Sequence, residues 1–144
     1  MQIFYPSFLA TKCNNDKYKY TIYVGIDETD KFYREYINHF SQYQSENCKI
    51  IPRILTGCEH KPAFAWNKLF EYAYEAGHDY FYQIGDDIRM MTPWVERFVK
   101  ILEERGNKGV VGGCHDFNYY GRLNSGKEPV IENVPFVHEV IQTI

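Results

Sequence analysis

The sequence predicts an α/β fold, a layered and mostly parallel sheet flanked by helices. One observation, the alternation of two kinds of segment, supports this prediction. Short segments rich in β-branched and aromatic residues alternate with longer segments whose apolar residues recur at helical spacing. Such alternation is typical of layered folds in which neighbouring strands run parallel. The length of 144 residues fits one domain over residues 1–144, and no repeat or linker interrupts it.

Four segments have the composition of strands. They are Tyr18–Val24, Lys49–Leu55, Asp79–Ile84 and Gly109–Gly112. Gly25 ends the first of them. Pro52 places the second near a sheet edge, because proline cannot donate a ladder hydrogen bond.

Three segments have the periodicity of helices. They are Lys31–Gln44, Lys61–Ala76 and a segment opened by Thr92 and Pro93 and closed by Gly106. At the start of the chain, Ile3–Leu9 forms a short helix or an irregular lead-in. Thr29 or Asp30 caps the first, whose apolar residues are Phe32, Tyr36, Ile37 and Phe40. The second has the clearest apolar face, and Gly77 stops it.

The composition indicates a folded, acidic protein. Aromatic residues make up 17% of the chain and hydrophobic residues 44%, which excludes a disordered chain. A formal net charge of -3 gives no global attraction to nucleic acid or to an anionic membrane. No segment approaches the roughly 18 apolar residues of a membrane span, and the N-terminus does not resemble a secretory signal.

The four cysteines show no CxxC spacing, so we expect reduced thiols in a cytoplasmic protein. An alternative is a zinc site made from Cys58, His60, Cys114 and His115. Only the first two of these residues have a spacing close to that of zinc ligands.

Two carboxylates follow the third predicted strand. Asp86 and Asp87 leave the sheet at its carboxyl edge, which is where open α/β sheets bind ligands. Adjacent carboxylates repel each other, and each is better ionised beside a cation. Oxygen ligands suit Mg²⁺ or Mn²⁺, so the pair is a candidate metal site. An ordinary solvated turn is the other interpretation of this short motif.

Two more acids follow the first strand. Asp27 and Asp30 can accept hydrogen bonds from a sugar hydroxyl or a base N–H. The alternatives are a solvated turn at Asp27 and helix capping by Asp30. Lys61 precedes the long second helix, where it can pair with a phosphate or be an ordinary exposed lysine. The chain has no P-loop, Rossmann or nucleophile-elbow motif.

Several motifs occur in a fixed order along the chain. They are Tyr20–Tyr33, Ala65–Phe70 with Ala73 and Tyr74, Asp79–Ile88, Trp94 and Gly109–Gly112. Together they resemble the small GT-A glycosyltransferases that large DNA viruses and some protists encode. The similarity covers nearly the whole chain, from Pro6 to Val137. Each motif alone is weak, and it is their order and spacing that make the set specific.

The resemblance implies the nucleotide-diphospho-sugar transferase fold and a nucleotide-sugar donor, most often a UDP-sugar, held through a divalent ion. By position, Asp27 would meet the nucleoside, and Asp86 with Asp87 would hold Mn²⁺ or Mg²⁺ against the diphosphate. Trp66 and Asn67 match the segment that shapes the donor pocket. The sequence does not identify the glycan or protein acceptor.

We nominate Asp116, which follows the fourth predicted strand, as the catalytic base that would act on this acceptor.

The chain also departs from the family pattern. Glu139 and Ile141 stand where an Arg and a His are expected, and we expect a fold truncated at both ends. These departures leave a second hypothesis open, a catalytically inactive module that binds nucleotide-sugars or a partner. A sugar-phosphate nucleotidyltransferase is less favoured, because no Gly-rich phosphate loop lies near the N-terminus.

Overall fold

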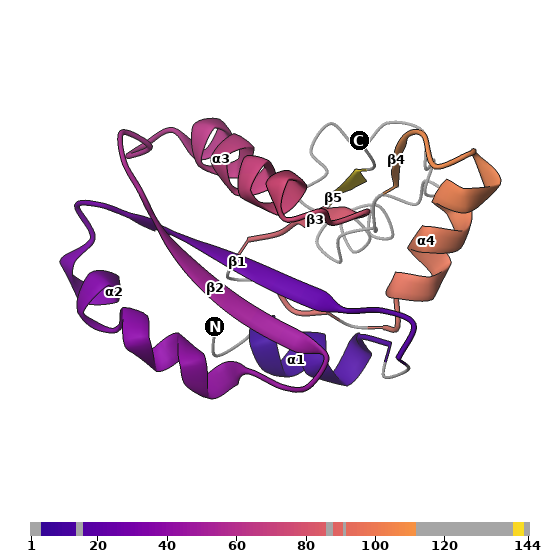
Figure 1. Ribbon diagram of the computed structural model, residues 1–144, viewed down its shortest axis with the longest axis horizontal. Helices are drawn as coiled ribbons and strands as arrows, with labels where there is room; N and C mark the ends of the chain where they lie inside the picture. Colours follow the sequence, from indigo (N-terminus) through magenta and orange to yellow (C-terminus); the bar gives the residue numbers. More distant parts are fainter. Residues whose placement is uncertain (1–3, 14–15, 86–87, 91, 112–139, 143–144) are drawn as a thin grey trace, which may run out of the picture. The chain divides into compact units, whose positions relative to one another are not determined.

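The computed structural model describes residues 4–13, 16–85, 88–90, 92–111 and 140–142 (Figure 1). The chain divides into two compact units. One is Cys13–Asp79, and the other, called here the terminal unit, combines Met1–Lys12 with Tyr80–Ile144. Each unit contains its own small sheet.

The Cys13–Asp79 unit is built on a parallel pair of strands. Strand β1 (Tyr20–Asp27) pairs along its whole length with strand β2 (Cys48–Leu55). Both strands are rich in the β-branched and aromatic residues that fit a pleated surface. Pro52 lies within β2, and β1 is the one strand that pairs with β2 in the described part of the chain. The predicted edge position of this segment is therefore confirmed.

Helix α3 (Pro62–Glu75) packs against this pair, and Figure 1 shows it on one side of the strands with the segment between β1 and β2 on the other. Its less exposed residues follow helical spacing and include Ala65, Trp66, Leu69, Phe70 and Ala73. Gly25 of β1 lies close under the helix. A Cβ atom added there would lie 2.7 Å from Leu55 Cδ1 and 3.2 Å from Leu69 Cδ1. The helix therefore sits on the strand at a distance that a larger residue would obstruct.

Helix α3 ends where the sequence predicted. Gly77 has a φ of 77°, and its N–H donates to the Tyr74 carbonyl (2.9 Å). The His78 N–H donates to the Ala73 carbonyl (3.2 Å), which completes a Schellman motif. Glycine reaches this left-handed conformation without the steric cost that other residues bear.

The segment between β1 and β2 differs from its prediction. The periodicity predicts one helix over Lys31–Gln44, but the structure has two short helices. They are α2 (Lys31–Glu35), an α-helix, and η1 (Ile37–Tyr43), a 3-10 helix. Phe40 is buried as expected, whereas Phe32 and Tyr36 are 62% and 45% exposed. A helix this short gains little from its own hydrogen bonds, so tertiary contacts decide its extent and its exposed face.

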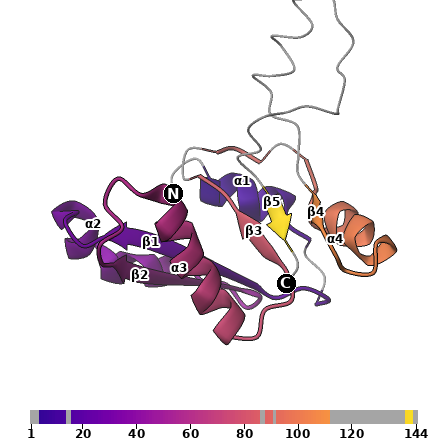
Figure 2. The same ribbon diagram turned by 90° about the horizontal axis from the view of Figure 1, so that it is seen from above.

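The described residues of the terminal unit form two helices and three short strands. They are α1 (Phe4–Thr11), β3 (Phe81–Gln83), α4 (Val95–Glu104), β4 (Val110–Val111) and β5 (Val140–Gln142). Figure 2 shows β5 between β3 and β4, and it runs antiparallel to both. Strands β3 and β4 therefore run in the same direction, although each pairs with β5 and not with the other.

Aromatic packing holds α4 on this sheet. The Tyr82 and Trp94 rings stack with their centroids 4.4 Å apart, and Phe98 lies edge-on to Trp94 at 6.0 Å. Leu102 is fully buried beside them. Offset and edge-to-face pairs of this kind stabilise a core beyond the area that they bury.

The fold is thus mixed α/β with a small parallel sheet, and the coarse fold prediction is confirmed to that extent. The expectation of parallel neighbours holds for β1 and β2. It is wrong for the pairings of the terminal unit, because β5 enters that sheet antiparallel from the far end of the sequence. No helix among the described residues is long and apolar enough to cross a membrane.

Candidate site at the carboxyl edge of the parallel strands

The two parallel strands end at the same edge. Asp27 is the last residue of β1, and it lies opposite Leu55, the last residue of β2. The turn that leads to α2 and the loop that leads to α3 therefore both begin at this edge, and both lie at the left of Figure 1. The carboxyl edge of parallel strands is where α/β sheets bind ligands. The structure thus brings Asp27 and the residues before α3 to one edge.

Glu28 connects the turn with the loop. Its N–H donates to the Leu55 carbonyl (3.1 Å), and its carboxylate Oε1 accepts a hydrogen bond from the Gly57 N–H (2.9 Å). Its carbonyl accepts from Arg34 Nη1 of α2 (2.9 Å). Sequence reasoning missed this residue, because nothing near position 28 indicates a partner 29 positions further along the chain.

Asp30 caps α2. Its Oδ1 accepts a hydrogen bond from the Tyr33 N–H (3.1 Å), and its own N–H donates to the Asp27 carbonyl (3.0 Å). The capping interpretation of Asp30 is therefore confirmed. Contact with a ligand at Asp30 stays a prediction, as does ligand contact at the half-buried Asp27.

Lys61 occupies the position before the first turn of α3, and its side chain makes no capping hydrogen bond there. Its Nζ lies 3.5 Å from the Gly57 carbonyl oxygen and 5.8 Å from the centre of the Phe64 ring. Both side chains are exposed, so the ammonium group remains accessible to solvent. The positive end of the α3 dipole and this ammonium group make the start of α3 the electropositive part of the edge.

Trp66 and Asn67 stand in the first half of α3 but differ in environment. Trp66 is half-buried on the side of the helix that carries Leu69 and Ala73, whereas Asn67 is exposed. Successive residues of a helix point about 100° apart, which accounts for the difference. Packing against the sheet accounts for Trp66, and a role for either residue in a donor pocket stays a prediction.

The remaining predicted site residues, Asp86, Asp87 and Asp116, lie outside the described residues. Strand β3 (Phe81–Gln83) lies within the predicted strand Asp79–Ile84 and ends before the two adjacent carboxylates, whose role stays a prediction. Within the described ranges no group of three His, Cys, Asp or Glu residues could hold a metal ion.

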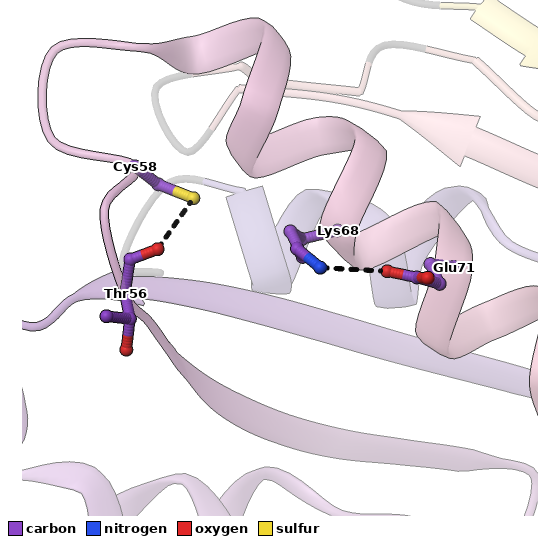
Figure 3. Close-up of polar contacts among 4 residues, drawn as sticks. All are labelled: Thr56, Cys58, Lys68 and Glu71. Atoms are coloured by element: carbon purple, nitrogen blue, oxygen red, sulfur yellow. Dashed lines mark hydrogen bonds and ion pairs between the residues drawn. The ribbon is translucent and has the colours of Figure 1, made fainter.

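The environments of Cys58 and His60 do little to support the alternative zinc site. Cys58 is buried, and its Sγ lies 3.6 Å from the Thr56 carbonyl oxygen (Figure 3). His60 is exposed, and its Nε2 lies 3.8 Å from Glu59 Oε1. The other two residues of this hypothesis, Cys114 and His115, lie outside the described residues.

The exposed face of α3 carries one ion pair, drawn in Figure 3. Lys68 Nζ donates a hydrogen bond to Glu71 Oε2 (3.2 Å), and this bond raises the pKa of Lys68 above its usual value. Both side chains are more than half exposed, so water screens the pair. It supports the helix surface and takes no part in the site.

No known protein family, curated protein or solved structure matches this chain. The interpretation of the candidate site therefore rests on the chemistry of its own residues. One edge of a parallel pair gathers hydrogen-bond acceptors at Asp27 and Asp30, together with the Lys61 ammonium group and the positive end of the α3 dipole. Such an edge can hold a ligand that is both anionic and rich in hydroxyl or amide groups, as a nucleotide is.

Proposed function

We propose that this protein is a metal-dependent glycosyltransferase of the GT-A type, which moves a sugar from a UDP-sugar to an acceptor. The observation that carries the proposal is the ordered set of motifs around Asp27 and Asp86–Asp87. Two structural features support it. Asp27 ends a strand of a parallel pair, and the start of α3 lies at the same edge.

The nucleoside half of the donor belongs at this edge. The Asp27 carboxylate would accept a hydrogen bond from the base or the ribose, while Lys61 and the first turn of α3 would attract the diphosphate. Trp66 and Asn67 would line the donor pocket from α3. In this arrangement the acids would recognise hydroxyl or amide groups, and the ammonium group would attract phosphate.

Asp86 and Asp87 would hold Mn²⁺ or Mg²⁺. Their donor set fits, because two carboxylates supply the oxygen ligands that these hard cations prefer. Bound there, the ion would neutralise the charge that builds up on the departing UDP. Asp116 would accept the proton of the acceptor hydroxyl.

A thermal shift experiment tests the proposal. A ligand present at about 100 times its Kd stabilises the folded state by about 2.7 kcal/mol, which corresponds to a rise in Tm of roughly 8 °C for a chain of this size. UDP and a panel of UDP-sugars should raise Tm in Mn²⁺ and much less in EDTA. An equal shift in both conditions, or no shift with any donor, would contradict the proposal.

A second candidate is a catalytically inactive module that binds nucleotide-sugars. One observation favours it: Ile141, which stands where the resemblance expects a histidine, is part of β5 and pairs with Tyr82 and Val111. An apolar residue paired within a sheet offers neither a metal ligand nor a base. Under this alternative a UDP-sugar binds, but no free sugar is released from it and none reaches an acceptor.

A further inference from the structure

The loop between β2 and α3, residues 56–61, decides where Lys61 and the first turn of α3 lie. This loop contains two residues in the left-handed region, Gly57 with a φ of 69° and His60 with a φ of 56°. Such backbone is rarely favoured by a non-glycine residue, so contacts elsewhere must hold the loop in this conformation.

Most of the contacts described for this loop are local. Cys58 Sγ approaches the Thr56 carbonyl, Lys61 Nζ approaches the Gly57 carbonyl, and the Lys61 N–H donates to the Cys58 carbonyl (2.9 Å). Local bonds shape the loop, but they do not fix it against the rest of the unit. The burial of Cys58 supplies one attachment to the unit.

Glu28 supplies the other attachment. Its carboxylate accepts the hydrogen bond from the Gly57 N–H, and its backbone is itself fixed through the bonds to Leu55 and Arg34. A hydrogen bond to an ionised acceptor is stronger than one between neutral groups. Glu28 also follows Asp27 directly in the sequence, so the same short turn carries the predicted nucleoside contact and the attachment of the loop.

We propose that Glu28 is a positioning residue that fixes the loop before α3 against the end of β1 and thereby sets the affinity for UDP. This inference rests on the proposed function. Glu28 acts through the Gly57 N–H and does not touch the ligand itself. Its effect on binding is to hold Lys61 and the first turn of α3 in the geometry that receives the diphosphate, which reduces the ordering that binding would otherwise require.

A purely electrostatic effect of Glu28 and a positioning role predict different changes in UDP affinity. A carboxylate near a diphosphate repels it, so loss of the charge alone should tighten UDP binding equally in Glu28→Gln and Glu28→Ala. A positioning role separates the two variants. The amide oxygen of Gln can still accept the Gly57 N–H, whereas Ala leaves that N–H without its partner.

The test compares the wild-type protein with Glu28→Ala, Glu28→Gln and a control, Glu59→Ala. Glu59 is an exposed acid of the same loop, and its Oε1 lies 3.8 Å from Nε2 of the exposed His60. Hydrogen exchange of the loop amides reports on the attachment, and calorimetry with UDP and Mn²⁺ reports on binding. Far-UV circular dichroism checks that each variant is folded.

We expect the Gly57 amide to exchange about tenfold faster in Glu28→Ala, because its hydrogen bond is lost. UDP affinity should fall about tenfold, or about 1.4 kcal/mol. Glu28→Gln and Glu59→Ala should stay within about threefold of the wild type in both measurements.

Unchanged exchange in Glu28→Ala would overturn the attachment. Faster exchange with unchanged or tighter UDP binding would overturn the positioning role. Failure of the wild type to bind UDP would refute the proposed function and the binding half of this inference, while the exchange rates would still decide whether Glu28 fixes the loop. If Glu28→Ala does not fold, Glu28→Gln decides: a large loss of affinity in that folded variant contradicts the inference.

Discussion

Replacing Gly25 with alanine tests how closely the side chains of Leu55 in β2 and Leu69 in α3 approach β1. The new Cβ would stand 2.7 Å from Leu55 Cδ1 and 3.2 Å from Leu69 Cδ1. Carbon atoms pack best at about 3.5–4.0 Å, so the Leu55 side chain would have to move by roughly 1 Å. Leu55 is only 4% exposed and has little room to do so.

Two opposing effects set the expected size. Overpacking of a core costs about 1–3 kcal/mol, whereas replacing glycine with alanine restrains the unfolded chain and recovers about 0.4–1 kcal/mol. We therefore expect Gly25→Ala to destabilise the protein by about 0.5–2 kcal/mol, which urea denaturation monitored by circular dichroism can measure.

A double-mutant cycle with Leu55→Ala shows whether the contact is the cause. Leu55→Ala alone should cost about 2–5 kcal/mol, because it leaves a cavity. If the alanine at position 25 meets Leu55, the double variant should be more stable than the sum of the two single effects predicts, by about 0.5–2 kcal/mol. Additivity within about 0.5 kcal/mol would refute the close approach of Leu55 to position 25 described above.

Three further predictions concern other parts of the chain. Leu102→Ala should destabilise the protein by about 2–5 kcal/mol in urea denaturation, because Leu102 is fully buried, and a loss below 1 kcal/mol would contradict its place in the core. Asp30→Ala should cost about 1 kcal/mol through loss of the cap on α2, while Asp30→Asn should stay close to wild type, and equal losses would exclude capping as the cause. The hydrogen bond from Lys68 to Glu71 raises the pKa of Lys68 above its usual value of about 10.5. The small stabilisation from this bond should therefore be complete below that value and fade as the pH rises through the higher folded pKa. The Tm difference between wild type and Glu71→Gln should therefore shrink above that pH, and a growing difference would contradict this assignment.

Periodicity and composition predicted most elements of the fold. The segments for β1, β2, α3 and α4 were located within a few residues, because each has a clear apolar pattern. The predicted end of the first strand at Gly25 was wrong, since β1 continues through Gly25 to Asp27. The helix predicted over Lys31–Gln44 failed, since Phe32 and Tyr36 have helical spacing but lie at the surface. Spacing alone does not show whether a core lies opposite such a face.

The sheet of β3, β5 and β4 could not be predicted from local sequence, for a different reason. Phe81 pairs with Gln142 and Val110 pairs with the same residue, so β5 is defined by contacts with residues far away in the sequence. A segment of three residues carries too little pattern to predict such a pairing.

Part of the candidate site could likewise be predicted. The sequence placed Asp27 at the end of the first strand and Lys61 just before a helix, and the structure has both there. That the two share one edge follows from the parallel pairing of β1 with β2, which the structure shows. The hydrogen bond from the Gly57 N–H to Glu28 could not be predicted, because it depends on how the turn after β1 meets the loop after β2.

Calorimetric titration of UDP tests the central claim most directly. The wild type should bind UDP in Mn²⁺ and at least tenfold more weakly in EDTA, a difference of about 1.4 kcal/mol or more. Asp87→Ala should show the weak binding in both conditions. The control Asp79→Ala, which removes an exposed acid before β3, should behave as the wild type does. UDP binding that is independent of Mn²⁺ and unaffected by Asp87→Ala would contradict the account, as would the absence of binding.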